Sequence, residues 1–178
     1  TTEEFYRQEY LCEFIDGAGQ VFRRIKENTI AEGEDPIPGR NYVMGVDLGK
    51  AVDWTVITVI DRHTHKVVCI ERFNKIDWEF QASRIESVCL RYNTAPIWLD
   101  STGAGDPVAD NLQRKGLPIR RFQYTNSKKK ELIENLVLKF EYDKIKIIDF
   151  RPLIDELEIF TYEVSPRTRR IMYNAPVG

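Results

Sequence analysis

Residues 42–73 decide the fold of this chain, and they read YVMGVDLGKAVDWTVITVIDRHTHKVVCIERF. Three runs in this stretch, 42–49, 54–61 and 66–73, are rich in β-branched and aromatic residues and are separated by short polar turns. Such residues pack well on a pleated sheet, and short turns join neighbouring strands in antiparallel pairs. The stretch therefore predicts a three-stranded antiparallel meander.

Helix and strand signals alternate after this meander. Apolar residues recur at steps of three and four from Trp78 to Tyr92, which predicts an amphipathic helix. A second helix is expected with Asp106 as its N-cap, Pro107 in its first turn and Gly116 at its end. Short apolar runs predict strands at 96–100, 119–124 and 144–148.

The remaining signals belong to the C-terminal third of the chain. Asn126 or Ser127 can cap the next helix, and a last helix is expected around residues 153–160. Residues 162–178 predict a hairpin. A meander followed by alternating helices and strands predicts an α/β fold with helices on both faces of a mixed sheet, in which parallel crossover strands join the antiparallel three-strand meander. This order of elements resembles the ribonuclease-H-like fold.

The first 40 residues differ in character from the rest. Acidic and aromatic residues up to Phe14 have the spacing of a short amphipathic helix, and the stretch 31–40 is rich in Pro and Gly. Such a stretch cannot continue a helix or a central strand. We expect residues 1–40 to be a linker or extension and residues 41–178 to be the compact domain.

Composition narrows the class of protein. The chain has 178 residues, 42% hydrophobic and 30% charged, which is typical of a globular domain with a proper core. No apolar run approaches the roughly 20 residues that cross a bilayer, and no signal-peptide pattern opens the chain, so we expect neither a membrane span nor secretion. Cys12, Cys69 and Cys89 lack CxxC spacing, so we expect reduced thiols and no zinc site.

Two aspartates occupy corresponding places in the predicted sheet. Asp47 ends the first strand, Asp100 ends the first crossover strand, and glycines follow both closely. In the expected fold these strands are neighbours. An ionised carboxylate at the end of an apolar strand is stabilised by a cation, and carboxylate oxygens are ligands that Mg²⁺ and Mn²⁺ prefer. The pair predicts a divalent-metal site of the kind that hydrolyses phosphodiesters.

A structural role is the alternative for each acid. Aspartate also favours turns, so Asp47 and Asp100 can serve only the turns after their strands. Asp53 lies six positions after Asp47 (53 − 47 = 6) and either approaches the metals or holds the turn. His63 and His65 lie in a polar turn without a Cys or His cluster, so we expect them to be exposed.

Basic residues gather in three places, although the net charge of −2 excludes a polycation. The three groups are Arg114, Lys115, Arg120 and Arg121; Lys128, Lys129 and Lys130; and Arg167, Arg169 and Arg170. A lysine run is often only a solvated face, whereas arginines on a hairpin can lie along a phosphate backbone. The second and third groups are our candidates for nucleic-acid contact. No GxxxxGK[ST] motif occurs, so no such phosphate cradle for ATP is expected.

Several segments resemble one known family, the C-terminal nuclease domain of the large terminase subunit of tailed double-stranded-DNA bacteriophages. Residues 5–14 (FYRQEYLCEF) look like the segment that joins the packaging ATPase to the nuclease. Residues 45–49 (GVDLG), with Asp53 behind them, are similar to the hairpin of the first acid. Residues 98–107 (WLDSTGAGDP) resemble the second-acid strand and its helix, and they are the most specific match.

The resemblance implies a metal-dependent endonuclease that cuts concatemeric viral double-stranded DNA during genome packaging. By position, Asp47 would bridge two Mg²⁺ or Mn²⁺ ions, Asp100 would ligate one of them, and Asp53 would be an accessory acid. The third acidic ligand of the family follows a segment like residues 173–178, so we expect it beyond residue 178. Domain 41–178 is then expected to be shortened at its C-terminal end.

The implied partners are double-stranded DNA, an N-terminal ATPase domain of the same protein, and the portal and small terminase subunit. No membrane is implied, and the implied location is the host bacterial cytoplasm. The predicted extension 1–40 would lead from the ATPase domain.

Two other functions remain open. The Asp-x-Gly of Asp47-Leu48-Gly49 also opens actin-like ATPases and sugar kinases, but these need a second phosphate loop and an adenosine loop in a chain about twice this size. Neither loop is found here. The other alternative is a non-catalytic module that docks DNA or another packaging protein through the arginine hairpin, and the expected absence of a third acid favours it.

Overall fold

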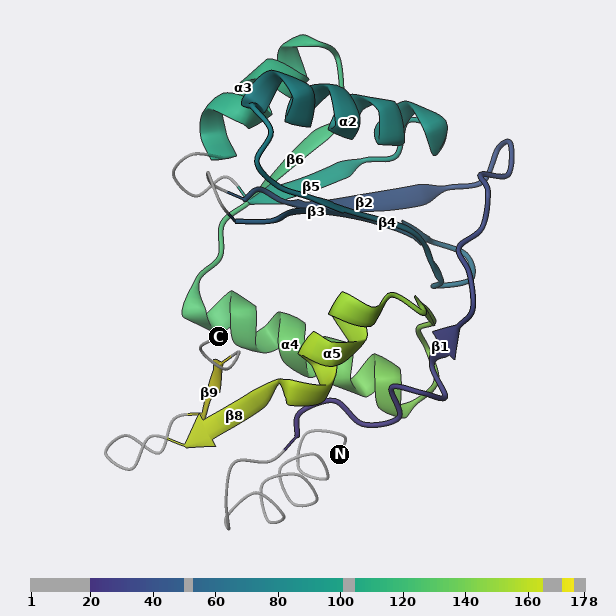
Figure 1. Ribbon diagram of the computed structural model, residues 1–178, viewed down its shortest axis with the longest axis vertical. Helices are drawn as coiled ribbons and strands as arrows, with labels where there is room; N and C mark the ends of the chain where they lie inside the picture. Colours follow the sequence, from purple (N-terminus) through teal and green to yellow (C-terminus); the bar gives the residue numbers. More distant parts are fainter. Residues whose placement is uncertain (1–19, 50–52, 101–104, 165–170, 175–178) are drawn as a thin grey trace.

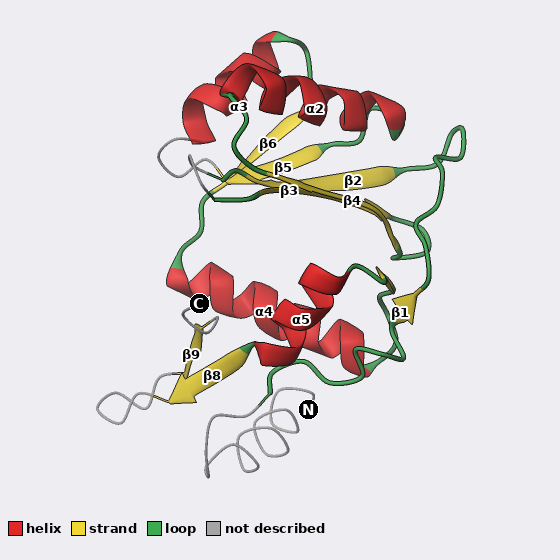
Figure 2. Ribbon diagram, in the orientation of Figure 1, coloured by secondary structure: helices red, strands yellow, loops and turns green. Residues whose placement is uncertain are grey.

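The computed structural model describes residues 20–49, 53–100, 105–164 and 171–174. A central sheet lies between two layers of helices (Figures 1 and 2). Its five strands have the order β4-β3-β2-β5-β6. They are β2 (Tyr42–Asp47), β3 (Thr55–Asp61), β4 (Val67–Phe73), β5 (Ile97–Asp100) and β6 (Ile119–Phe122).

The strand directions confirm the predicted mixed sheet. β2 pairs with β3 and β3 with β4 in antiparallel register, while β5 runs parallel to both β2 and β6. Four helices are described, namely α2 (Trp78–Arg91), α3 (Gly105–Arg114), α4 (Asn126–Glu141) and α5 (Arg151–Ile159). This is the ribonuclease-H-like α/β fold that the order of the elements predicted.

The face of the sheet that α2 and α3 cover carries the larger hydrophobic core. Met44 and Val46 of β2 and Ile97 and Leu99 of β5 are buried there against residues such as Ile85 of α2. The pattern arises because side chains alternate between the faces of a strand, so every second residue faces this core. The N-terminus of α2 is capped by Asp77, whose side chain accepts a hydrogen bond from the backbone N–H of Phe80.

A second core lies under α4 and α5. Val137 and Phe140 of α4 and Leu157 of α5 are buried together with Val67 of β4 and Phe22. The segment that contains Phe22 leads into β1 (Thr29–Ile30), which pairs in parallel with β7 (Ile147–Ile148). Residues 20–30 therefore pack against the compact domain, whereas the predicted boundary at residue 41 stays a prediction.

A short strand forms within the predicted range 144–148 as β7, but it pairs with β1, and Lys146 makes only an isolated parallel bridge to Lys66 beside β4. Two local predictions were wrong. The N-cap of α4 is Thr125, and Asn126 and Ser127 lie inside the helix. α3 begins at Gly105, so Asp106 lies in its first turn. Local signals often misplace helix ends by one or two residues.

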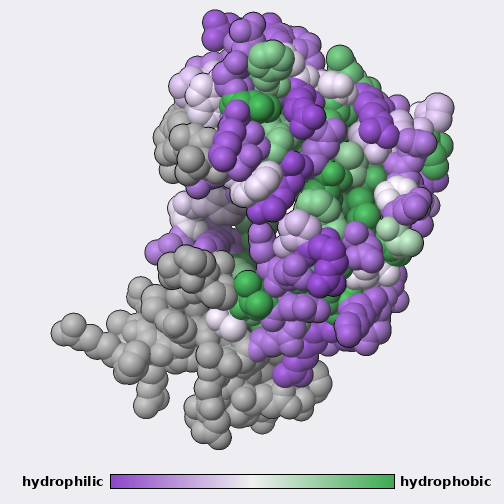
Figure 3. All heavy atoms as spheres, viewed as in Figure 1, coloured by the Kyte–Doolittle hydropathy of each residue, from purple (hydrophilic) through white to green (hydrophobic). Residues whose placement is uncertain are grey.

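The tail forms the predicted hairpin of β8 (Thr161–Val164) and β9 (Ile171–Asn174), which pair in antiparallel register. Cys69 and Cys89 are unpaired thiols, and burial raises the pKa of Cys89 to about 11. Cys12 and the predicted helix around residues 5–14 lie outside the described residues. No helix in the described ranges is both long and apolar enough to span a membrane. Figure 3 shows a mostly hydrophilic surface on the viewed side, with small hydrophobic areas.

Candidate active site

Asp47 and Asp100 are next to each other at the carboxyl ends of two parallel strands. The β2–β5 register pairs Val46 with Leu99, so the following residue of each strand is an aspartate. Adjacent strands are about 4.8 Å apart. Because Val46 and Leu99 face the α2–α3 core, Asp47 and Asp100 lie on the opposite face, which α4 and α5 cover.

The electrostatics of Asp47 reflect this neighbourhood. Part of the residue is exposed to solvent, but neighbouring protein atoms partly desolvate its carboxyl group. The pKa of Asp47 is raised first by this desolvation and then by the negative charges of Asp100 and Asp53. Repulsion among the three acids is therefore felt at Asp47, and a bound cation relieves it.

Asp53 lies close to the end of β2. A Cβ atom on Gly49 would lie 2.5 Å from the backbone oxygen of Asp53, so only glycine allows this approach. The Gly49 N–H donates to the Thr55 hydroxyl at 2.9 Å, and that hydroxyl donates to Oε1 of Gln81 at 2.7 Å. These buried hydrogen bonds tie Gly49 and the start of β3 to α2, a positioning role for Thr55 and Gln81 that the sequence did not reveal.

Tyr124 is the other residue at this site that the sequence analysis missed. Its ring contacts Phe122 edge to face, with 4.9 Å between the ring centroids, and Phe122 is the register partner of Asp100. Burial raises the pKa of the Tyr124 hydroxyl, and the charges of Asp47 and Asp100 raise it further. The signal that indicates Tyr124 is the alternation of β6, which continues past Phe122 onto the same face.

The donor set fits a hard divalent cation. Two carboxylates on adjacent strand ends, with a third acid close enough to affect the pKa of Asp47, supply the oxygen ligands that Mg²⁺ prefers, and Mg²⁺ usually keeps several waters. In the described part of the chain, no three His, Cys, Asp or Glu side chains form a complete metal-binding group. Asp47 and Asp100 are therefore two carboxylates on adjacent strand ends whose oxygens could ligate a divalent ion.

The predicted basic candidates are placed differently from one another. Nζ of Lys128 lies over the ring of Phe122, 5.2 Å from its centroid, and thus near the acids. Nζ of Lys130 instead forms an ion pair with Oε1 of Glu134 at 3.6 Å, and Lys129 is exposed on α4. The three arginines of the hairpin, Arg167, Arg169 and Arg170, lie outside the described residues. His63 and His65 are exposed, as predicted.

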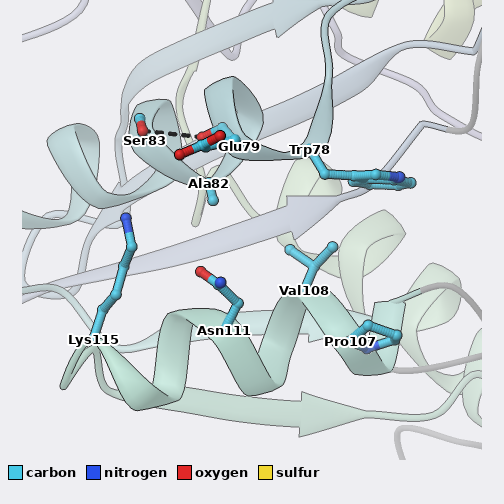
Figure 4. Close-up of a pocket in the computed structure, with 8 residues that line it drawn as sticks. All are labelled: Trp78, Glu79, Ala82, Ser83, Pro107, Val108, Asn111 and Lys115. Atoms are coloured by element: carbon cyan, nitrogen blue, oxygen red, sulfur yellow. Dashed lines mark hydrogen bonds between the residues drawn. The ribbon is translucent and has the colours of Figure 1, made fainter.

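A separate pocket of about 540 Å³ lies between α2 and α3 (Figure 4). Trp78 and Ala82 of α2 and Val108 of α3 give it an apolar lining, and Asn111 and Lys115 of α3 add polar groups. Its helices cover the face of the sheet opposite to Asp47 and Asp100. The pocket is therefore distinct from the carboxylate site.

Comparison with known proteins gives one consistent family. The family model of the terminase RNaseH-like domain matches residues 44–168, which is more than half of the chain and includes both aspartates. The large terminase subunit of Thermus virus P23-45 is 30% identical over 181 residues, which cover 94% of this chain and 36% of that protein. The chain thus spans about a third of the length of the curated relatives it matches.

Solved structures agree with this match. The large terminase nuclease from thermophilic phage G20c with bound magnesium superposes with a TM-score of 0.79 at 27% identity, covering 88% of this chain and 87% of that chain. The same nuclease with bound cobalt has a TM-score of 0.79 at 26% identity, covering 88% of each chain.

Proposed function

The chain belongs to the family of terminase RNaseH-like domains, and from this membership and the carboxylate pair we propose that it is a divalent-metal-dependent nuclease that cuts viral DNA during genome packaging. The observation that carries the proposal is the position of Asp47 and Asp100 on adjacent parallel strands and on the same face of the sheet. The match of the fold to phage nucleases with bound magnesium or cobalt supports it.

In this proposal Asp47 and Asp100 hold the metal, and Asp53 is an accessory acid. Divalent ions held by these residues would activate a water and stabilise the leaving oxygen of the phosphodiester, as in two-metal hydrolysis. The backbone of the chain positions these acidic side chains. The register of β2 and β5 fixes the spacing of the two carboxylates, and hydrogen bonds through Gln81 hold Gly49 and Thr55, on either side of Asp53, against α2. We propose Mg²⁺ or Mn²⁺ as the ions.

The wider context is also a proposal. Since the chain spans about a third of its curated relatives, we propose that residues 1–40 link a nuclease domain at 41–178 to an ATPase domain of a longer protein. The third acidic ligand is then expected beyond residue 178. We also propose double-stranded DNA as the substrate, the portal and small terminase subunit as partners, and the host cytoplasm as the location. Lys128, Lys129, Lys130 and the hairpin arginines Arg167, Arg169 and Arg170 are the candidates for contacting DNA.

A plasmid assay tests the nuclease. We expect the chain to nick and linearise supercoiled plasmid with Mg²⁺ or Mn²⁺ and not with EDTA. Asp47→Asn and Asp100→Asn should each lower the rate by at least about 100-fold, because even residues that only support metal ligands are worth about 10- to 100-fold. Asp155→Asn is the matched control, since Asp155 only forms an exposed ion pair with Arg151 on α5.

Metal binding has its own readout. Divalent ions that bind the folded state raise its melting temperature Tm, so Mn²⁺ should raise the Tm of the wild type and of Asp155→Asn but not that of Asp47→Asn. Plasmid binding without cutting, with the same Tm shift for all three proteins, would instead support the non-catalytic docking module. The family match leaves the actin-like ATPase alternative without support.

A further inference from the structure

The strand β6 presents a row of basic and aromatic residues beside the two acids. β6 is the outer strand of the sheet next to β5. Ile119 packs against the α2–α3 core, and Arg121 pairs with Asp110 of α3, so the residues between and after them, Arg120 and Phe122, lie on the opposite face. This is the face of Asp100, whose register partner is Phe122.

Two further residues extend this row. Tyr124 follows the end of β6 and packs its ring against Phe122, and Lys128 in the first turn of α4 lies over the same ring. We call Arg120, Phe122, Tyr124 and Lys128 the β6 rim. Phe122 is half-buried and packs against the side chains of Tyr124 and Lys128, whereas Tyr124 is 55% exposed.

The cations of the β6 rim differ from their neighbours in pairing. Within the described ranges, Arg120 and Lys128 form no ion pair, whereas Arg121 pairs with Asp110 and Lys130 pairs with Glu134. A cation without a carboxylate partner remains available to an external anion. Two such cations therefore border the site where the proposed function requires a phosphodiester.

The aromatic part of the rim adds a second kind of contact. An exposed tyrosine ring can lie against a deoxyribose or a base, and its hydroxyl can donate to a phosphate oxygen. Tyr124 is close enough to Asp47 and Asp100 for both charges to affect its hydroxyl. The combination of phosphate-binding cations and an exposed ring is typical of surfaces that follow a nucleic-acid backbone.

We propose that Arg120, Tyr124 and Lys128, supported by Phe122, bind the sugar-phosphate backbone of one DNA strand and hold it across Asp47 and Asp100. This inference rests on the proposed nuclease function and names the surface that positions its substrate. Arg120 and Lys128 bind phosphates along the same row as the exposed ring, and their charges offset the repulsion between the acids and the phosphodiester. They are positioning residues, and none of them ligates the metal.

Binding of a fluorescent duplex in EDTA tests the β6 rim without any cleavage. We expect Arg120→Gln and Lys128→Gln each to raise the Kd by roughly 3- to 10-fold and to reduce the slope of log Kd against log salt by about one, because each removes one phosphate contact. Tyr124→Ala should weaken binding more than Tyr124→Phe, which keeps the ring. The Tm of each variant checks that the fold is intact.

The matched controls are Arg121→Gln and Lys139→Gln, which remove the same charges from the adjacent position of β6 and from the last turn of α4. Both should bind within about twofold of the wild type. Equal losses of DNA affinity in the rim and control variants would contradict the proposal that the β6 rim binds DNA. Wild-type affinity in all rim variants would contradict it as well.

Cleavage separates this inference from the nuclease proposal. If the wild type cuts plasmid and the rim variants cut equally well at limiting DNA, the proposed role of the β6 rim is wrong and the nuclease proposal is supported. If no divalent metal supports cutting but the rim variants alone lose DNA binding, the nuclease proposal is wrong and the β6 rim is supported as a DNA-binding surface. Asp47→Asn should abolish cutting without weakening binding in EDTA.

Discussion

Each of the two site acids follows a residue that faces the other side of the sheet. Val46 and Leu99 are buried in the α2–α3 core, and the next residues, Asp47 and Asp100, emerge on the opposite face. A shift of one residue in either strand would bury its carboxylate and expose its neighbour. The buried partners therefore hold the acids in place, where desolvation and then the charges of Asp100 and Asp53 raise the pKa of Asp47.

Asp61, which lies away from the candidate site at the end of β3, has a structural role. The residue is 1% exposed. Burial acts to raise its pKa, but hydrogen bonds from the Arg40 side chain at 2.8 Å and from the backbone N–H groups of His63 and Thr64 outweigh it, so the pKa of Asp61 is lowered. The ionised carboxylate thus stabilises the turn after β3 and ties residue 40 to the sheet.

We expect Asp61→Asn to lower the free energy of unfolding by about 1–3 kcal/mol at pH 7, because it removes a charge-assisted hydrogen bond from a buried position. A lowered folded-state pKa stabilises the fold above the ordinary aspartate value near 3.9 and ceases to do so as the pH falls through the folded value. The difference between the two proteins should therefore shrink in acid, which urea denaturation at a series of pH values measures. A difference that stays constant down to about pH 3 and below would contradict this account.

At the scale of elements, α4 links the second core to the site. Its buried residues Val137 and Phe140 pack in that core, while its first turn places Lys128 beside Phe122. The helix begins after Thr125, whose side chain accepts a hydrogen bond from the Lys128 N–H at 3.2 Å. The cap therefore positions the start of α4 and with it one end of the β6 rim.

We expect Thr125→Ala to lower the free energy of unfolding by about 1 kcal/mol, since a lost N-cap costs about 0.5–2 kcal/mol. Thr125→Ser keeps the hydroxyl and should behave like the wild type. Ser127→Ala should change little, because Ser127 lies inside the helix. Urea denaturation measures all three, and a larger loss for Ser127→Ala than for Thr125→Ala would show that the cap is misassigned.

At the scale of the whole molecule, two cores lie on opposite faces of one sheet. The second core includes Val21, Phe22 and Ile25, which precede the predicted boundary at residue 41. Phe22 is 3% exposed, and its ring centroid lies 5.6 Å from those of Phe140 and Phe160. Asn28 adds a buried hydrogen bond of 2.9 Å to the backbone oxygen of Phe140. The stability of the compact domain thus depends on residues that come before β2.

We expect Phe22→Ala to lower the free energy of unfolding by about 3–5 kcal/mol, as for other large-to-small changes in a core. Ile37→Ala is the control, since Ile37 lies in the same predicted extension but is 43% exposed, and it should cost less than about 0.5 kcal/mol. Thermal and urea denaturation provide the measurement. Equal stability of the two variants would mean that residues 20–30 fold independently of the domain.

Local signals in the sequence were enough to predict most of the elements and the two strand-end acids. Hydrophobic period and turn residues are local signals, so the β2–β4 meander, the helices and the positions of Asp47 and Asp100 at strand ends followed from neighbours a few residues apart. The α4 cap was misplaced by one residue because Thr125, Asn126 and Ser127 all have side chains that cap helices.

The contacts between distant segments depend on the fold of the whole chain. Pairing of β2 with β5 joins residues about fifty positions apart, so no local sequence pattern determines their register. That the two strands are neighbours was predicted only from the resemblance to the ribonuclease-H-like fold. Local sequence also does not determine the partners of β7, which has a strand-like sequence but pairs with β1, or those of Lys128 and Lys130, which are alike in sequence but face an aromatic ring and a carboxylate respectively. Side-chain environment depends on long-range packing, so the second core and the nearness of Tyr124 to the two acids became evident only in the folded chain.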